Sequence, residues 1–542
     1  MSKVSAYLNE HLQGEVTTNS YVRKQYSTDG SVLSIIPDMV AYPRSTSDLR
    51  KIARFSWQLS EKGHALSITP RGNGTDQTGG AIGNGVVVDL AVHMNAIFEV
   101  DAKQRLVRLQ PGVTVRTLSE ALRLQGLYVP ALIGLPNDTT IGGAIANNSA
   151  GSISGKYGAI GSAVSQLEVI LSNGEVLQTG RVSKKLVERK KGLQTFEGEI
   201  YRSVDNLIND NDELLDTLAV DVRDNVGYNL VDTKRRDGSI DLTPLIVGSQ
   251  GTLGTISEII LKAEPLPSQP LVVAIAFPSY DSARDGLDAL RGLYPSLLDL
   301  MDGRLFVDAA TQGKRYKFHT DALDHGEVSA VVVAEFDDAS SHVKKKTAKK
   351  IAKMFSDESV YVILERDPDK IADLQTLPSV VQFVQVSEKS EMCAPPFLNG
   401  AYIPQDRFED FAIALLALEQ KHHIDLPLSG HASQHVYYTY PLLNFHKVSD
   451  RQTLFKLLAE WSMAVSAHGG HLIGEDGEGR LKALFAYKDL DDDVVDLFAS
   501  VRSIFDPQGI MNTGVKQSVE LKKLATELNS DYDSGDSAWR VN

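Results

Sequence analysis

The sequence predicts an α+β fold in which a glycine-rich domain of mixed helices and strands precedes a domain built on an open antiparallel sheet. Three observations predict this fold. Short β-rich runs alternate with amphipathic helical stretches up to about residue 265. The segment 265–270 holds three prolines in six residues, which breaks regular structure. Beyond it, strand-like runs such as LVVAIAF alternate with helical stretches, and we expect their helices to cover one face of the sheet.

Composition limits the class of protein. The 542 residues include 55 basic and 70 acidic side chains, a net charge of −15, which argues against a nucleic-acid partner. The single cysteine, Cys393, excludes an internal disulfide and cannot supply the four thiolates that an iron–sulfur cluster usually takes. The longest apolar runs have the length of a strand, so we expect a cytoplasmic protein, or at most one peripheral to a membrane.

Changes of composition and of hydrophobic pattern along the chain predict five segments. The expected segments are an N-terminal helical arm at 1–36, a first domain at 37–265, a second domain at 266–490, a C-terminal return to the first domain at 491–516 and a flexible tail at 517–542.

The first glycine-rich segment directly follows the strand-like run ALSIT. Glycine at alternate positions lets the backbone approach a ligand closely, so that successive N–H groups can converge on a pyrophosphate. A plain turn between two strands is the competing interpretation, because another strand follows at once. The candidate binding residues here are Arg71, Gly72, Asn73, Gly74, Thr75 and Gly79.

Two further segments of small residues occur in the same β-rich region. Small residues leave room for a planar ligand against the backbone, with hydroxyl and amide groups available to its polar edge. Three such segments in one domain favour a single large cofactor over three unrelated loops. The candidate residues are Pro136, Gly142, Gly143, Asn148, Ser149 and Gly158 in the second segment, and Gly254 and Ile256 in the third.

The motifs RGNGT, TIGGAIANNSAGSISGKYG and GSQGTLGTISEIILK resemble the FAD-binding (PCMH-type) domain of the vanillyl-alcohol oxidase type, as in flavin-dependent D-lactate and other 2-hydroxy-acid dehydrogenases. The C-terminal FDPQGIMNTGVK resembles the segment of that family that returns to the flavin, so the resemblance covers roughly 37–516. It implies a two-subdomain FAD-binding fold with a ferredoxin-like antiparallel-sheet cap, at 266–490. It also implies that Asn512 lies near the flavin and Ile256 near the adenine. Because 71–80 contain no histidine for a covalent tether, we expect non-covalent FAD.

The segments ANNSAG, GHAS and GEDGEGR look closest to the branch whose larger members carry an iron–sulfur domain. The resemblance implies oxidation of a small carboxylate substrate, a D-2-hydroxy acid such as D-lactate. Electrons would then pass to a separate acceptor: an iron–sulfur protein, a cytochrome or a quinone. The number of subunits stays open, with a homodimer as one option.

The catalytic pattern departs from that family. Relatives place two histidines seven residues apart and follow them with a Glu-His pair, residue types that suit a divalent metal and a base. Here His431 and Glu475 match, which implies a site for Zn, Mn or Fe, but Tyr438 and Asp476 replace the other two histidines. Asn399 and Gly400 also stand where relatives carry an acidic pair.

Two explanations of these departures stay open. In a rewired site, His435 or His471 replaces a lost ligand or base, or Asp476 accepts a proton after burial raises its pKa. Alternatively, the hydroxy-acid site is lost or repurposed, which leaves a flavoprotein for another substrate or a non-catalytic flavin-binding subunit.

Overall fold

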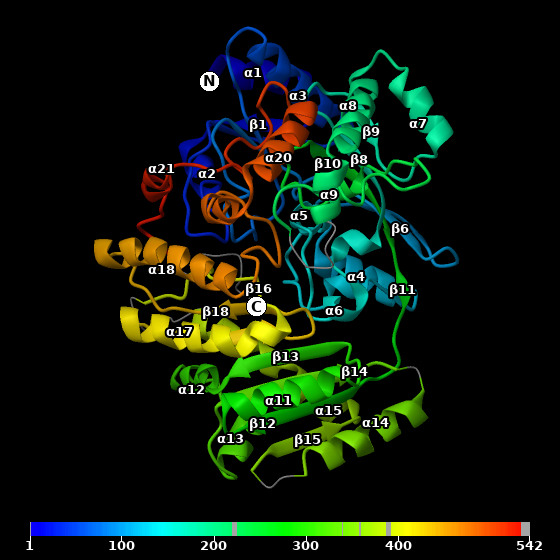
Figure 1. Cartoon of the computed structure of the whole chain (residues 1–542). Coiled ribbons are helices and arrows are strands. Elements are labelled where there is room, and N and C mark those ends of the chain that lie inside the picture. Colours follow the sequence, from blue (N-terminus) through cyan, green and yellow to red (C-terminus); the bar gives the residue numbers. More distant parts are fainter. Residues whose placement is uncertain (1, 219–224, 339, 357–358, 386–391, 533–542) are drawn as a thin grey trace.

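The computed structural model of the chain describes residues 2–218, 225–338, 340–356, 359–385 and 392–532. It contains an N-terminal half with two main sheets and a second half built on one large sheet, as Figure 1 shows from top to bottom. The α+β class with an antiparallel-sheet cap is therefore confirmed. We call residues 271–486, which contain this large sheet and its helices, the cap.

The first sheet has the strand order β1-β2-β4-β3 and is parallel except for β1. Helix α3 connects two of its parallel strands and begins where the Ser45 side chain accepts a hydrogen bond from the Asp48 amide. The strands are β1 (Glu15–Thr17), β2 (Met39–Tyr42), β3 (Ile68–Arg71) and β4 (Val86–Asp89).

The second sheet is antiparallel, with the order β5-β6-β10-β8-β9. A two-stranded ribbon lies where the chain leaves this half for the cap. In it, β11, at the start of the linker, pairs with β7 of the N-terminal half. The strands are β5 (Ile97–Asp101), β6 (Leu106–Leu109), β8 (Val164–Ile170), β9 (Val176–Gln178) and β10 (Thr255–Lys262), with β7 (Leu127–Tyr128) and β11 (Glu264–Pro265) in the ribbon.

The helices of this half begin and end as follows: α1 (Ser2–His11), α2 (Ser20–Gln25), α3 (Thr46–Ser60), α4 (Val115–Arg123), α5 (Ile141–Asn147), α6 (Ser154–Tyr157), α7 (Lys184–Lys191), α8 (Phe196–Asp210), α9 (Asp212–Leu218) and α10 (Thr243–Ile246).

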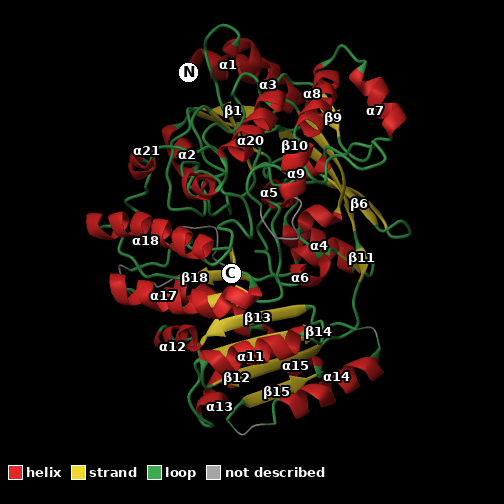
Figure 2. Cartoon of the chain, viewed as in Figure 1, coloured by secondary structure: helices red, strands yellow, loops and turns green. Residues whose placement is uncertain are grey.

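The cap sheet is antiparallel throughout, with the order β15-β12-β14-β13-β17-β18-β16. Figure 2 shows its strands in yellow among the cap helices. The strands are β12 (Leu271–Phe277), β13 (Leu297–Asp302), β14 (Ala330–Phe336), β15 (Tyr361–Glu365), β16 (Ala401–Tyr402), β17 (Leu428–His431) and β18 (Val436–Thr439).

Helices cover both faces of this sheet, which corrects the expectation that they cover one. Successive side chains of β12 enter two different cores: Val273 packs with α11 and α17, and Val272 packs with α12 and α15. Burial on both faces explains why LVVAIAF is a continuous apolar run instead of an alternating one. The cap helices are α11 (Tyr280–Arg291), α12 (Gly303–Thr311), α13 (Lys317–Leu323), α14 (Ser341–Met354), α15 (Pro368–Gln375), α16 (Val380–Gln385), α17 (Phe408–His422), α18 (Val448–Ala467) and α19 (Ala483–Ala486).

The C-terminal part of the chain crosses back to the first half. Helix α20 (Asp492–Phe505) buries Val501 and Phe505 in the core of the second sheet. The following loop then runs beside β3, where the amide of Ile68 donates to Ile510 O at 2.8 Å and the amide of Asn512 donates to Ile68 O at 2.8 Å.

Both ends of the chain differ from the expected arm and tail. The arm includes a strand, β1, that joins the first sheet. Residues 517–532 form α21 (Leu521–Thr526) and pack on the arm, where the Ser34 amide donates to Glu527 O at 2.7 Å. Leu524 and Tyr532 are buried in the core that also contains Phe445, whose ring centre lies 5.0 Å from that of Tyr532. The rest of the expected tail, 533–542, lies outside the described residues.

None of the helices in the described part of the chain combines the length and the apolar character needed to cross a membrane.

A fully buried ion pair fastens the C-terminal return to the cap. The Lys516 ammonium lies 2.6 Å from a carboxylate oxygen of Glu478, and neither side chain is exposed. The other oxygen of Glu478 accepts hydrogen bonds from the Gly227 amide at 3.1 Å and the Tyr487 hydroxyl at 2.8 Å. The carboxylate is thus held by three donors from three different segments.

We predict that Lys516→Met lowers the free energy of unfolding by about 3–5 kcal/mol, because it leaves the Glu478 charge buried without a counter-ion. Removing both charges with Glu478→Gln/Lys516→Met should restore most of the loss. Urea denaturation of the three proteins measures this difference. A double variant as unstable as Lys516→Met would contradict the explanation.

Candidate functional site

A cavity of about 780 Å³ separates the glycine-rich loops of the first half from one face of the cap sheet. Its volume is in the range of cofactor and ligand pockets. Loop residues near 70–81, 133–153 and 249–256 form one wall, and residues of β13, β14, β17 and β18 form the other. The three glycine segments therefore meet in space, as the interpretation of one shared cofactor requires.

The first two glycine segments touch so closely that a side chain would not fit between them. A Cβ on Gly72 would lie 2.0 Å from the hydroxyl oxygen of Thr140, and a Cβ on Gly142 would lie 2.5 Å from the Pro111 ring. Thr140 also begins α5, where its hydroxyl accepts a hydrogen bond from the Gly143 amide at 3.3 Å. These contacts leave room only for glycine at both positions, so the backbone itself is exposed at this part of the wall, which suits the close approach of a large cofactor.

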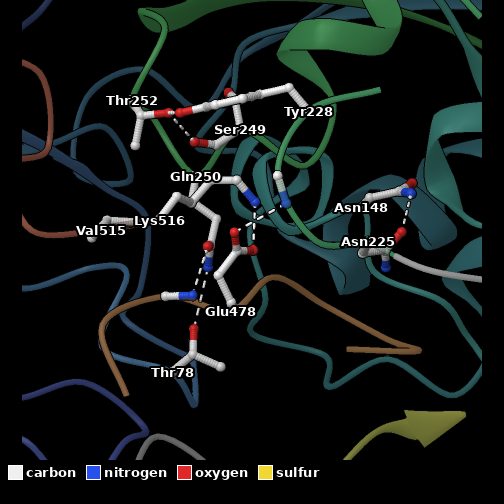
Figure 3. A network of polar contacts seen from close by, with 12 residues as sticks. Thr78, Asn148, Asn225, Tyr228, Ser249, Gln250, Thr252, Glu478, Val515 and Lys516 are labelled. Carbon is white, nitrogen blue, oxygen red and sulfur yellow. Dashed lines mark hydrogen bonds and ion pairs between the residues drawn. The ribbon is translucent and has the colours of Figure 1, made fainter. Parts of the chain in front are cut away.

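The Gln250 side chain joins all three segments. Figure 3 shows it together with its partner Thr78 in the first segment. Its amide nitrogen donates to the Thr78 hydroxyl at 3.2 Å and to the Asn147 side-chain oxygen at 3.0 Å. Its amide oxygen accepts from the Gly479 amide of the GEDGEG turn at 2.9 Å. Gln250 has a positive φ of 51°, an uncommon conformation for a residue that is not glycine.

Asn512 closes the same junction from the C-terminal return. Its side-chain nitrogen donates to Gly80 O at 2.8 Å and to Gln250 O at 2.7 Å, and the residue is completely buried. It does not line the cavity. Its position supports a role in holding two cavity loops instead of direct contact with a ligand.

Most of the cofactor residues expected from the sequence lie in the cavity wall. Those in the wall are Arg71, Gly72, Asn73, Gly74, Thr75, Pro136, Gly142, Gly143, Ser149, Gly254 and Ile256. Gly79, Asn148, Gly158 and Asn512 lie outside it. Asn148 and Gly158 are the C-terminal caps of helices α5 and α6, and both have a positive φ. This backbone conformation explains why these residue types occur in the motif.

On the cap side, strand pairing places a histidine against an aspartate. His431 on β17 is directly opposite Asp299 on β13, so both side chains project from the same face of the sheet. The ring nitrogen Nδ1 of His431 lies 2.7 Å from a carboxylate oxygen of Asp299, which is nearly fully buried. The aspartate therefore fixes the orientation of the imidazole and makes Nε2 the basic nitrogen.

Two more hydrogen-bonded pairs occupy the positions where the sequence departs from the family. The Tyr438 hydroxyl donates to the Glu475 carboxylate, and burial together with this carboxylate raises the pKa of Tyr438. The Ser149 hydroxyl donates to Asp476 at 2.7 Å. Surrounding protein and the charge of Glu475 raise the pKa of Asp476 to about 7, although the side chain is partly exposed to the cavity.

The expected metal site at His431 and Glu475 is not borne out. Within the described ranges, no group of three or more His, Cys, Asp or Glu side chains is arranged to hold a metal ion. The physical reason is that a tyrosine hydroxyl and an aspartate bind the two matched ligands. The donor set therefore does not fit a divalent metal.

Two of the predicted bases, His435 and His471, do not line the cavity. His435 is in the hairpin turn after β17 with a positive φ of 59°, and burial lowers its pKa to about 4. His471 pairs through its backbone with Tyr402 at the edge strand β16. Of the three catalytic candidates, only Asp476 lies in the wall.

Three residues of the site were missed by the sequence analysis: Asp299, Gln250 and Lys482. A charged residue in the apolar run LLDLMD is the signal that could have identified Asp299. Lys482 lines the cavity with its ammonium group bonded to Asn399 O, and burial lowers the pKa of this lysine to about 8. No local pattern distinguishes Gln250, whose partners are far apart in the sequence.

The chain matches two protein families. The family described as FAD binding domain matches residues 37–180, and the family described as FAD linked oxidases, C-terminal domain, matches residues 266–515.

Relatives of known name are similar over most of the chain. A D-2-hydroxyglutarate dehydrogenase of Pantoea ananatis is 28% identical over 96% of this chain and 51% of its own length. A D-lactate dehydrogenase of Archaeoglobus fulgidus is 25% identical over 88% of this chain and 90% of its own length. The chain spans about half the length of the D-2-hydroxyglutarate dehydrogenases that it matches.

Among solved structures, the 4-ethylphenol oxidase of Gulosibacter chungangensis superimposes with a TM-score of 0.69 at 15% identity, covering 96% of this chain and 98% of that one. At this identity the likeness concerns the fold.

We predict that Gly74→Val abolishes FAD retention. Gly74 has a φ of +73°, and its new Cβ would meet the Arg71 guanidinium at 2.3 Å in the cavity wall. Gly126→Val is the matched control, since Gly126 has a φ of +70° but no atom within 4 Å of its Cβ position. Both variants carry the same backbone strain. The ratio of flavin to protein absorbance after purification should fall only in Gly74→Val; equal losses would refute the assignment.

Proposed function

Because the chain matches the FAD binding domain family at 37–180 and the C-terminal domain family of FAD linked oxidases at 266–515, we propose that it is an FAD-dependent dehydrogenase of a D-2-hydroxy acid. The observation that carries the proposal is a single cavity with the three glycine segments on one side and the His431–Asp299 pair on the other. Dehydrogenase relatives that act on D-lactate and D-2-hydroxyglutarate support the substrate class.

The first half of the chain supplies the residues that would hold FAD. The backbone from Gly72 to Thr75 would contact the pyrophosphate, and Gly142, Gly143 and Ser149 would lie along the cofactor. Gln250 and Asn512 would keep these loops at their spacing through the hydrogen bonds described above. Bound FAD supplies the acceptor for the hydride that leaves the substrate carbon.

His431 would act as the base for the substrate hydroxyl. Oxidation of a secondary alcohol removes a proton from oxygen as the hydride leaves carbon. His431 lines the cavity, and its Nε2 is the nitrogen that would accept this proton. Asp299 then stabilises the imidazolium, because its carboxylate holds the Nδ1–H at 2.7 Å.

FAD is proposed to be bound without a covalent tether, and its electrons to leave to a separate acceptor: an iron–sulfur protein, a cytochrome or a quinone. The glycine-rich wall supports the first point, since its loops at 70–81 contain no histidine or cysteine to attack the flavin. One cysteine, Cys393, cannot supply the thiolates of an iron–sulfur cluster, which supports an acceptor outside these 542 residues.

We predict that acid precipitation of the purified protein releases its flavin into the supernatant, because hydrogen bonds and packing hold FAD and do not survive unfolding. Absorbance of the supernatant and of the redissolved pellet measures the distribution. Colour that remains with the pellet would show a covalent bond.

We predict that D-lactate, glycolate or D-2-hydroxyglutarate bleaches the flavin band of the wild-type protein under anaerobic conditions. His431→Asn should slow this bleaching by about 10²- to 10⁴-fold at normal FAD content, because the proton then lacks its acceptor. Stopped-flow absorbance measures the rate.

Variants His435→Asn and His471→Asn provide the comparison, since both histidines lie outside the cavity wall. In both variants the hydroxy acid should reduce the flavin at close to the wild-type rate. A larger defect in His435→Asn than in His431→Asn would contradict the assignment of the base, and a flavin that no hydroxy acid bleaches would contradict the proposed function itself.

A further inference from the structure

A 2-hydroxy acid would bring a negative charge into the cavity, and that charge needs a partner. The inference below rests on the proposed function, because it concerns how this substrate is held. A carboxylate in a cavity of low polarity is stable only beside a cation or several hydrogen-bond donors. In the family that the sequence resembles, a divalent metal suits this task.

In this chain, the positions that would form the metal site are bonded to one another or to neighbours. Asp299 holds His431, Tyr438 donates to Glu475, and Ser149 donates to Asp476. Two of these pairs exist because tyrosine and aspartate replace histidine. A side chain whose lone pairs are already shared in this way is a poor metal ligand.

The described wall contains two basic side chains, Arg71 and Lys482. Arg71 belongs to the first glycine segment and donates to the backbone oxygens of Thr28 and Ala81, so it serves the loop structure. Lys482 is on the side of the GEDGEG turn, beside the residues of the cap face. Its side chain is 3% exposed.

The hydrogen bonds of Lys482 leave part of its capacity for a ligand. An ammonium group has three N–H donors, and among the described residues Nζ donates to the backbone oxygen of Asn399. No described carboxylate forms an ion pair with it. A buried lysine with so few partners is expensive unless an anion joins it.

The nearby acids are bonded to neutral groups. Glu475 and Asp476 accept the tyrosine and serine hydroxyls already named, and Asp76 accepts from the Gly80 amide at 2.6 Å and the Asn147 side chain at 2.8 Å. Asn399 is neutral, where relatives carry an acid. An aspartate at this position would lie close to the ammonium and compete with a substrate.

We propose that Lys482 binds the carboxylate of the substrate and that this site works without a metal ion. Lys482 thus sets the charge of the substrate that the cavity accepts, while His431 serves the hydroxyl group. The two functional groups of a 2-hydroxy acid are recognised by different segments of the chain.

The wild-type holoprotein gives the first test. Elemental analysis should find less than stoichiometric Zn, Mn and Fe, and prolonged treatment with EDTA should leave the rate of flavin reduction unchanged. L-lactate, the mirror image of a substrate, should perturb the flavin spectrum at lower concentration than L-lactamide, which lacks the charge. One metal per chain with loss of reduction after chelation, or equal affinity for acid and amide, overturns the proposal.

Variants give the second test. Lys482→Met should weaken L-lactate binding and raise the KM for the reducing hydroxy acid by about 10- to 100-fold at unchanged FAD content. Asn399→Asp should also weaken L-lactate binding and raise the KM, because it adds a competing negative charge and keeps the lysine. Lys488→Met, six residues further along and exposed, is the control and should match the wild type.

The outcomes separate this inference from the proposed function. A flavin that is reduced by a hydroxy acid with the same KM in Lys482→Met and wild type overturns the inference and leaves the function standing. A flavin that no hydroxy acid reduces contradicts the function, and the titration with L-lactate then still decides the role of Lys482. If Lys482→Met does not retain FAD, the Asn399→Asp variant and the comparison of L-lactate with L-lactamide decide whether Lys482 binds the carboxylate.

Discussion

The arrangement of the cavity depends on the side chain of Gln250. One amide group bonds the first glycine segment, the second glycine segment and the turn that carries Glu475 and Asp476. A group of this kind has to be buried to reach all of them, and burial is tolerable only because both its nitrogen and its oxygen are bonded. Its backbone oxygen, in turn, accepts from Asn512. The cofactor loops, the cap and the C-terminal return are therefore held at a common point.

The second constraint is the alternation of side chains along the cap strands. Leu298 and Leu300 enter one core, so Asp299 between them projects from the opposite face, toward the cavity. The same rule places Ser429 and His431 beside it on β17. Chemistry-bearing residues thus occupy the positions between core residues. The cavity accommodates many acids because each one is paired with a donor.

The sequence was informative wherever function depends on a local motif. The three glycine segments, the proline-rich boundary and the cap were predictable, since glycine spacing and strand periodicity are local signals. The partners of His431 and Glu475 were not, because Asp299 reaches His431 only through strand pairing, and Tyr438 reaches Glu475 only through the folding of a distant turn onto β18. His435 was a reasonable candidate by its position in the motif. The tight turn between β17 and β18 directs His435 away from the cavity, and the residue types of the turn do not predict this direction.

The return of the chain to β3 has a consequence during protein synthesis. Strand β3 is at the edge of the first sheet, and its outer side pairs with the loop around Met511. Ribosomes add about 5–20 residues per second, so roughly 20 to 90 seconds pass between the emergence of Gly80 and that of its hydrogen-bond partner Asn512. For this time the edge strand and the glycine loop beside it lack their C-terminal partner. A nascent chain with an open strand edge can pair with another chain, so the order of synthesis places the greatest risk of aggregation before the segment around Met511 is made.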